Sequence, residues 1–208
     1  MFTGLIREIA HVESFANHTL RLRAAYAPKI GDSIAINGAC LTVTSLQFPT
    51  FEVELSKESR DILALENYSG QVHMEPAMQL GDRIEGHMVQ GHIDCIGTID
   101  GITQRENGWD FFITMPAKFL SLMMPKGSIA IDGVSLTIND VTPKGVRLTI
   151  INHTMQNTLF ASYRVGRRVN IESDMFARYL FHMLNQKATT TRDATLSWED
   201  AYAITAHY

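Results

Sequence analysis

The 208-residue sequence has only two cysteines, Cys40 and Cys95, and their wide separation does not suggest a disulfide framework. It also lacks a continuous apolar run of about eighteen residues, which a membrane-spanning helix would need. The N-terminus shows neither the basic nor the apolar segment of a signal peptide. These absences predict a reduced, cytoplasmic protein that makes no membrane contact.

Clusters of lysine and arginine are also missing, and the formal net charge is −4. Because binding to nucleic acid requires a basic patch to neutralise phosphates, this composition argues against a nucleic-acid partner. A phosphorylated ligand would have to be held by a helix N-terminus instead. Hydrophobic residues make up 45% of the chain, as is usual for a globular protein with a sizeable core.

What the sequence does contain is an internal repeat. Residues 31–44 (GDSIAINGACLTVT) align with residues 126–139 (KGSIAIDGVSLTIN), and half of the aligned positions are identical. Two further matches keep the same order, residues 1–12 with 88–99, and VHME at 72–75 with VNIE at 169–172. Order and spacing are both preserved, which indicates duplication of a unit of roughly 85–90 residues.

Each unit is predicted to form a small antiparallel barrel. Its segments are short runs rich in β-branched residues, separated by turns, and several alternate apolar with polar residues. Closing such strands into a barrel removes exposed edges. The expected strands are 19–24, 33–36, 41–44 and 51–55 in the first unit, and 110–114, 128–131, 136–139 and 146–150 in the second.

Helical segments are expected at three places. Short helical pieces should follow strand 51–55, at 58–65, and precede strand 128–131, at 117–123. After Asp174 a helix should carry an apolar stripe and pack on a barrel or, as we favour, on another subunit. A last short helix is expected at 198–206. The stripe consists of Phe176, Tyr179, Leu180, Met183 and Leu184.

Five motifs occur in an order that resembles the riboflavin synthase family of the α-subunit type. They are MFTG, NGACLTVT, GHMVQGHID, IDGVSLTI and VNIESDMFARYL. The resemblance implies an all-β fold of two tandem duplicated six-stranded Greek-key barrels, at 1–87 and 88–173, followed by a C-terminal α-helix at 174–187. It implies that three chains trimerise through this helix, and it says nothing of the tail at 188–208.

The resemblance also implies the activity. Two molecules of 6,7-dimethyl-8-ribityllumazine would exchange a four-carbon fragment, giving riboflavin and 5-amino-6-ribitylamino-uracil without cofactor or metal. Each active site would lie between the N-terminal barrel of one chain and the C-terminal barrel of its neighbour. Two homologous pockets facing each other would supply proximity for a reaction between identical molecules. An association with lumazine synthase is left open.

Four residues are the candidates for catalysis. Cys40 aligns with Ser135, each followed by Leu-Thr, and the family's pocket positions imply site roles for both and for Thr137. The plain alternative for Cys40 is a small buried hydrophobe. His92 aligns with Leu5, so the barrel does not require a histidine there. Because imidazole exchanges protons near neutral pH, His92 is expected to act as an acid or base, or to polarise the ring.

The family pattern implies further ligand contacts in both units. Phe2 resembles an aromatic residue that closes over the ligand ring, with core packing as the alternative. Asp174 is expected either in the site or as the helix N-cap, and the two roles can coexist. The predicted substrate-binding residues are Phe2, Gly4, Leu5, Ile6, Ser33, Leu41, Thr42, Glu54, Leu55, Ser56, Lys57, Glu58, Ser59, Gly91, Ile93, Lys126, Leu136, Ile151, Asn152, His153, Thr154, Met155, Gln156 and Asp174.

Two departures from the family pattern fall in the first unit. His73 stands where the family commonly has asparagine, and residues 60–68 lack the usual threonine-rich run. Three alternatives to the enzyme remain: a lumazine-binding antenna protein of the same fold, a flavin-nucleotide reductase domain, and a metal site formed by His87, His92 and Cys95. The metal site is disfavoured because His92 and Cys95 would project to opposite sides of an extended segment. His87 is expected to be a junction residue.

Overall fold

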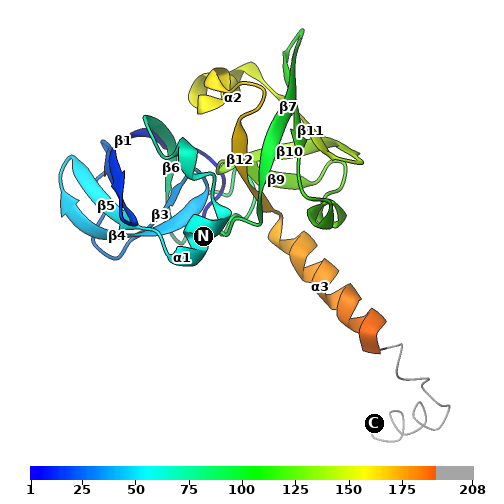
Figure 1. The fold of residues 1–208 in the computed structure, drawn as a ribbon, viewed down its shortest axis with the longest axis horizontal. Helices are drawn as coiled ribbons and strands as arrows, with labels where there is room; N and C mark the ends of the chain where they lie inside the picture. Colours follow the sequence, from blue (N-terminus) through cyan, green and yellow to red (C-terminus); the bar gives the residue numbers. More distant parts are fainter. Residues whose placement is uncertain (191–208) are drawn as a thin grey trace, which may run out of the picture.

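The structure is a computed structural model that describes residues 1–190. Two closed barrels of six strands lie side by side, and a C-terminal helix projects away from the second barrel (Figure 1). The strand order around the first barrel is β1-β2-β5-β4-β3-β6. Around the second barrel it is β7-β8-β11-β10-β9-β12, which is the same order when β1 to β6 are replaced by β7 to β12. The predicted all-β duplication is confirmed.

The strand bounds follow the repeat. The first barrel contains β1 (Glu8–Ala16), β2 (Thr19–Arg23), β3 (Ser33–Ile36), β4 (Ala39–Gln47), β5 (Thr50–Glu54) and β6 (Gln71–Pro76). The second contains β7 (Cys95–Arg105), β8 (Gly108–Thr114), β9 (Ser128–Ile131), β10 (Val134–Thr142), β11 (Gly145–Ile150) and β12 (Arg168–Ser173). All eight predicted strands are present. The first strand of each barrel was not predicted, and the last strand of each contains the aligned VHME or VNIE segment.

Short helices connect the strands. They are α1 (Lys57–Ile62), η1 (Leu65–Asn67), η2 (Ala117–Leu122), α2 (Asn152–Asn157) and η3 (Leu159–Ser162), where η marks 3-10 helices. The helical pieces predicted at 58–65 and 117–123 are therefore found, the first split into an α-helical and a 3-10 turn. The α2 segment, which corresponds to α1 in the repeat, was not predicted as a helix.

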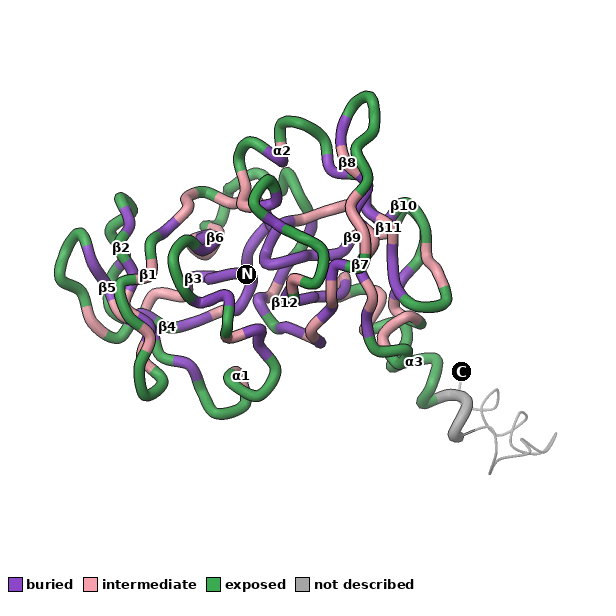
Figure 2. The backbone as a smooth tube through the Cα atoms, turned by 45° about the horizontal axis from the view of Figure 1, so that its top comes forward, coloured by how far each residue is buried: buried purple, intermediate pink, exposed green. Residues whose placement is uncertain are grey.

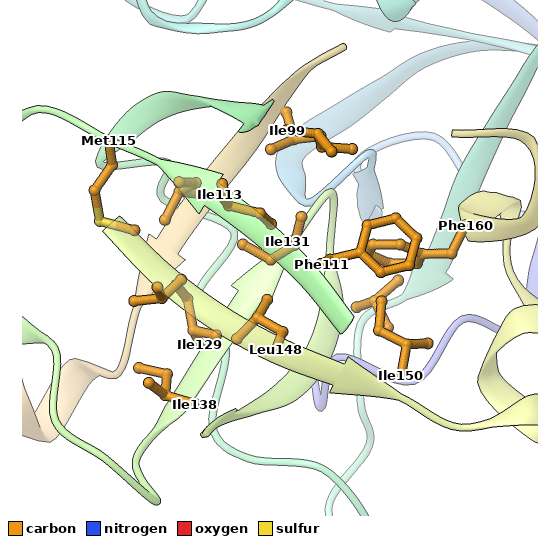
Figure 3. Close-up of a cluster of buried hydrophobic side chains, with 14 of the residues drawn as sticks. Ile99, Phe111, Ile113, Met115, Ile129, Ile131, Ile138, Leu148, Ile150 and Phe160 are labelled. Carbon is orange, nitrogen blue, oxygen red and sulfur yellow. The ribbon is translucent and has the colours of Figure 1, made fainter. Parts of the chain in front are cut away.

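Each barrel encloses its own hydrophobic core. Alternate residues of a strand point to one face, so every second side chain reaches the barrel interior. In the second barrel these side chains interdigitate with Phe160 from η3, whose ring lies edge-on to Phe111 at 5.3 Å (Figure 3). The labelled core residues are Ile99, Phe111, Ile113, Met115, Ile129, Ile131, Ile138, Leu148, Ile150 and Phe160.

The two barrels exchange the segments that precede their first strands. We call residues 2–6 and 89–93 the exchanged segments, because each packs against the barrel of the other unit. Phe2 pairs with Val89 in an isolated antiparallel bridge between the barrels, where its ring is fully buried. Ile6 packs against the core of the second barrel, whereas Ile93 belongs to the core of the first. The strands of the first barrel thus precede the predicted boundary at 87/88 and those of the second follow it. The exchanged segment of each unit nevertheless packs on the barrel of the other unit.

A polar cluster with approximate twofold symmetry joins the barrels. Asn37 accepts the backbone N–H of His73 at 2.9 Å, and Asp132 accepts that of Asn170 at 2.7 Å. Asn170 donates from its side-chain amide to the Asn37 carbonyl and accepts the N–H of Ala64, both at 2.9 Å. The duplicated positions therefore make duplicated hydrogen bonds.

His73 reproduces the hydrogen bonds of Asn170 on the other side of this cluster. Its Nδ1 lies 2.9 Å from the Asp132 carbonyl oxygen, and its Nε2 accepts the N–H of Leu159 at 2.8 Å. A neutral imidazole protonated on Nδ1 therefore replaces an amide, with one donor and one acceptor. Burial lowers the pKa of His73 to about 4, which keeps the ring neutral. The departure at this position lies in the barrel interface and outside the two cavities described below.

The C-terminal helix is α3 (Met175–Thr190). Asp174 caps it, because its carboxylate accepts the Phe176 N–H at 2.7 Å, so the N-cap role is confirmed. The predicted stripe lies on a largely exposed helix, with Leu184 64% exposed (Figure 2). None of the helices among residues 1–190 has the length and apolar character needed to cross a membrane. The helix predicted at 198–206 falls outside the described residues.

Candidate active site

Two cavities occupy equivalent places on the two barrels. The first, which we call the Cys40 pocket, has a volume of about 420 Å³ and lies between the start of β4 and helix α1. Its walls come from both units, because residues 91–93 of the second unit complete it. It is lined by Ala39, Cys40, Glu58, Ser59, Ile62, Leu63, Gly91, His92 and Ile93.

The second cavity, the Ser135 pocket, has a volume of about 320 Å³ and lies between the start of β10 and helix α2. Residues 4–6 of the first unit complete it, as residues 91–93 complete the Cys40 pocket. Ser135 takes the place of Cys40, and Thr154 that of Ser59. It is lined by Gly4, Leu5, Ile6, Arg7, Glu85, Val134, Ser135, His153, Thr154, Asn157 and Thr158.

Backbone contacts hold the exchanged segments against Cys40 and Ser135. The Cys40 N–H donates to the Gly91 carbonyl at 2.9 Å, and the Ser135 N–H donates to the Gly4 carbonyl at 2.8 Å. Gly4 and Gly91 have φ values of +75° and +80°. A Cβ on either glycine would lie 2.6 Å from the Cβ of Ser135 or Cys40. Only glycine fits at these two turns.

Replacing Gly91 by alanine is expected to deform the Cys40 pocket, since the new methyl group would meet the Cys40 backbone as well as its Cβ. Gly70→Ala is the matched control, because Gly70 has a φ of +65° but no atom within 4 Å of the new Cβ. The control should lose about 1–2 kcal/mol from positive φ alone. Gly91→Ala should lose clearly more in urea unfolding, and equal losses would contradict this view of the pocket.

Two buried glutamates orient the exchanged segments. Glu75 accepts the N–H groups of Thr3 and Gly4, and Glu172 accepts those of Gln90, Gly91 and His92, at 2.7–3.1 Å. Burial raises the pKa of both carboxyl groups, and the backbone donors oppose that shift. Neither was predicted as a site residue, although the glutamate shared by VHME and VNIE was a visible signal.

His87 contacts Ser135, the candidate catalytic residue of the second pocket. Its Nδ1 lies 2.7 Å from the Ser135 Oγ, and its Nε2 is buried without a hydrogen-bond partner among residues 1–190. Burial lowers the pKa of His87, while the Asp174 carboxylate acts in the opposite direction. The interpretation of His87 as a junction residue is therefore incomplete. The two histidines of GH-x-x-x-GH lie at different places, since His92 lines the Cys40 pocket and His87 contacts the Ser135 hydroxyl without lining the Ser135 pocket.

His92 and Cys95 do not join His87 at one site. His92 is exposed and lines the Cys40 pocket, whereas Cys95 is buried in the core of the second barrel. Burial raises the pKa of the Cys95 thiol to about 12, so this thiol stays protonated. Within residues 1–190, no group of three or more His, Cys, Asp or Glu side chains is arranged to hold a metal ion.

The remaining predicted residues lie outside the two cavities. Thr42 and Thr137 sit on the outward face of their strands, two residues beyond Cys40 and Ser135, and Ser33 pairs with Thr42. Lys126 is exposed at a turn with a φ of +67°. Ser56 caps α1 by accepting the Ser59 N–H at 3.0 Å. Also exposed and outside the cavities are Glu54, Lys57, Ile151, Asn152 and Gln156.

Several predicted contact residues are part of the hydrophobic cores. Phe2 packs between the barrels with Ala35, Val89 and Ala130, which is the core role left open by the sequence. The others face the interior of a barrel. They are Leu41 and Leu55 in the first barrel and Leu136 and Met155 in the second. None of these four residues lines either cavity.

Each barrel matches a known class of domain. The sequence profile of the lumazine binding domain matches residues 3–77 and 90–174, one match for each barrel. The fold is also similar to that of LumP in complex with riboflavin, with a TM-score of 0.73 at 19% identity over 83% of this chain and 99% of that chain. The two barrels are therefore lumazine binding domains.

The chain is also similar in sequence to curated riboflavin synthases. Riboflavin synthase from Bacillus subtilis is 34% identical over 206 residues, which cover 95% of this chain and 96% of the relative. Riboflavin synthase from Photobacterium phosphoreum is 37% identical over 197 residues, covering 88% and 89%. The chain belongs to the riboflavin synthase family.

Proposed function

We propose that the protein is a riboflavin synthase that converts two molecules of 6,7-dimethyl-8-ribityllumazine into riboflavin and 5-amino-6-ribitylamino-uracil. The observation that carries this proposal is the pair of related cavities with different reactive groups. One holds Cys40 and His92, and the other holds Ser135 in contact with His87. Two equivalent pockets suit two identical substrates, and their different side chains suit the donor and acceptor roles.

The Ser135 pocket is the better place for proton transfer. Donation of a four-carbon unit requires loss of a proton from the C7 methyl group of one lumazine. The lowered pKa keeps His87 neutral near pH 7, so that its ring can accept a proton through or beside the Ser135 hydroxyl. His92 lies beside Cys40 in the pocket for the second lumazine, which accepts the four-carbon unit. There its imidazole would polarise the ring of the acceptor and return protons to it.

Assembly of a homotrimer would bring the two pockets together. Thr42, Thr137 and Lys126 lie on outward surfaces beside the cavities, where a neighbouring subunit could complete the binding site. Helix α3 projects away from the barrels (Figure 1), and its apolar side chains are exposed in a single chain, as expected for a helix that packs on other copies. Each complete site would then combine the Cys40 pocket of one chain with the Ser135 pocket of the next. The cytoplasmic location and an association with lumazine synthase stay predictions.

The test is to mix the purified protein with the lumazine and to follow both products by absorbance. Two lumazines should be consumed for each riboflavin formed, with no added cofactor. Sedimentation should give three times the mass of the chain. Tight lumazine binding without riboflavin formation would identify a non-catalytic binding protein instead and would overturn the proposed transferase activity.

A further inference from the structure

Arg178 connects the first turn of α3 to the turn that carries His92. Its guanidinium donates to Gln90 Oε1 at 2.7 Å, to Asp94 Oδ1 at 3.2 Å and to Glu172 Oε1 at 3.3 Å. It also approaches the carbonyl oxygen of His92 at 3.4 Å. One side chain thus contacts Gln90, His92 and Asp94 in the segment that carries His92, and Glu172 on β12.

The surroundings of Arg178 are largely shielded from water. The side chains of Glu172, Asp94 and Arg178 are 2%, 12% and 23% exposed. Asp94 uses its other oxygen to accept the Ser173 N–H and hydroxyl. Because Arg178 is the cation that faces both carboxylates, its loss would leave two partly buried negative charges beside each other. Burial and Asp94 already raise the pKa of Glu172, whereas Arg178 lowers it.

Arg178 has no hydrogen-bonded counterpart in the first unit. Glu75 accepts hydrogen bonds from Thr3 and Gly4, and among residues 1–190 it forms no ion pair, although the charge of Arg7 lowers the Glu75 pKa. The difference arises because β6 continues into a loop, whereas β12 continues into α3. Only the turn that carries a histidine is tied to the helix, while the turn that carries Leu5 is not.

We propose that Arg178 is a positioning residue that fixes His92 in the Cys40 pocket by holding Glu172, Asp94 and Gln90 in place. Through it, the seating of α3 determines where the His92 imidazole lies. This inference rests on the proposed function, since it assigns His92 a part in the reaction. A displacement of about 1 Å in such a group can cost a factor of about 10² in rate.

The test is a double-mutant cycle between Arg178 and His92, with kcat and KM measured for riboflavin formation. Arg178→Met alone should lower kcat by about tenfold or more with KM within about twofold, because the ground-state cavity stays open. In a His92→Ala background the same change should lower kcat by less than about twofold, since no imidazole remains to be positioned. Arg178→Lys should restore part of the activity, because it keeps the charge but has fewer donors.

Arg168→Met is the matched control, since Arg168 pairs with Glu66 on the exposed surface at 3.1 Å. It should leave kcat unchanged within about twofold. Equal losses from Arg178→Met in both backgrounds, or no loss in either, would overturn the positioning role. A loss of kcat can come from a displaced His92 or from dissociation of the oligomer, and sedimentation of each variant distinguishes the two. Equal losses of kcat accompanied by dissociation indicate a purely structural role. Absence of riboflavin formation by the unaltered protein would refute the proposed function itself, before the cycle is begun.

Discussion

Ser135→Ala is expected to lower kcat for riboflavin formation by about 10²- to 10⁴-fold, which is the range for loss of a general acid–base group. The hydroxyl is the polar atom that links His87 to the cavity, at 2.7 Å from Nδ1. Without it, the imidazole has no hydrogen-bonded route to a ligand in the pocket. KM should change much less than kcat, because the methylene of the side chain and the walls of the pocket remain.

His87→Gln should give a loss of similar size, and the double variant should be little worse than either single one. Groups that act as one unit show this non-additivity. Steady-state kinetics of the three variants, followed by riboflavin absorbance, measure it. Ser121→Ala is the control, because Ser121 is exposed and donates only to the Lys118 carbonyl. Retention of more than half of the activity in Ser135→Ala would contradict the assignment.

Stability must be measured alongside these activities. Removing the Ser135 hydroxyl leaves Nδ1 of a buried histidine without its partner, which costs about 1–3 kcal/mol. Thermal unfolding of each variant fixes a temperature at which all are folded, and the kinetic comparison belongs below it. A loss of rate that persists there reports on chemistry and not on the folded fraction.

His73→Asn is expected to make the protein more resistant to acid. The pKa of His73 falls from 6.5 in the unfolded chain to about 4 in the folded protein. Its contribution is therefore fully present above pH 6.5 and is lost as the pH falls towards 4, since the unfolded chain then binds a proton that the folded protein rejects. The difference amounts to about 3 kcal/mol.

Asparagine keeps both hydrogen bonds, because its amide can donate to the Asp132 carbonyl and accept from the Leu159 N–H. Asn170 makes the same pair of bonds at the equivalent place, to Asn37 and Ala64.

Charged and titratable groups near the His73 ring include Asp132, Tyr163 and Arg167, and all three remain in the variant. Burial raises the pKa of Asp132 to about 6, which gives a pH dependence of opposite sign. This second contribution largely cancels when variant and parent are compared.

The measurement is urea unfolding between pH 4 and pH 8. The two stability curves should run together above pH 7 and separate below pH 6.5, with the variant more stable at pH 4.5. His11→Asn serves as the control, since His11 is exposed on β1. Curves that stay parallel over the whole range would show that His73 is not a neutral group in the folded protein.

The sequence predicted the architecture well because the duplication supplied each strand pattern twice. The run SIAI followed by Gly and Leu-Thr marks β3–β4 and β9–β10 in the same way. The strands β6 and β12 were not among the eight listed, although VHME and VNIE had been aligned and alternate apolar with polar residues. Their polar residues are buried as well, which alternation alone does not indicate. Their glutamates and His73 were therefore not placed.

The candidate site was predicted in part. Cys40, His92, Ser135, Ser59 and Thr154 line the cavities, since strand starts and following helices recur in both copies. The contact between His87 and Ser135 joins residues 48 positions apart and depends on how the segment after β6 crosses to the other barrel. Arg178 likewise reaches back from the C-terminal helix. No local pattern encodes such crossings, because they are set by the packing of one unit on the other.

The exchange of leading segments bears on how the chain arose. Each barrel uses a wall of the other unit to close its pocket, and the hydrogen bonds between Asn37, His73, Asp132 and Asn170 repeat about the same axis. Two copies of a single-unit ancestor would form the same contacts as a segment-swapped homodimer. Gene fusion would then have linked two halves that already depended on each other. Covalent joining would have let the halves diverge, and the two pockets differ accordingly, with Cys40 in one and Ser135 in the other.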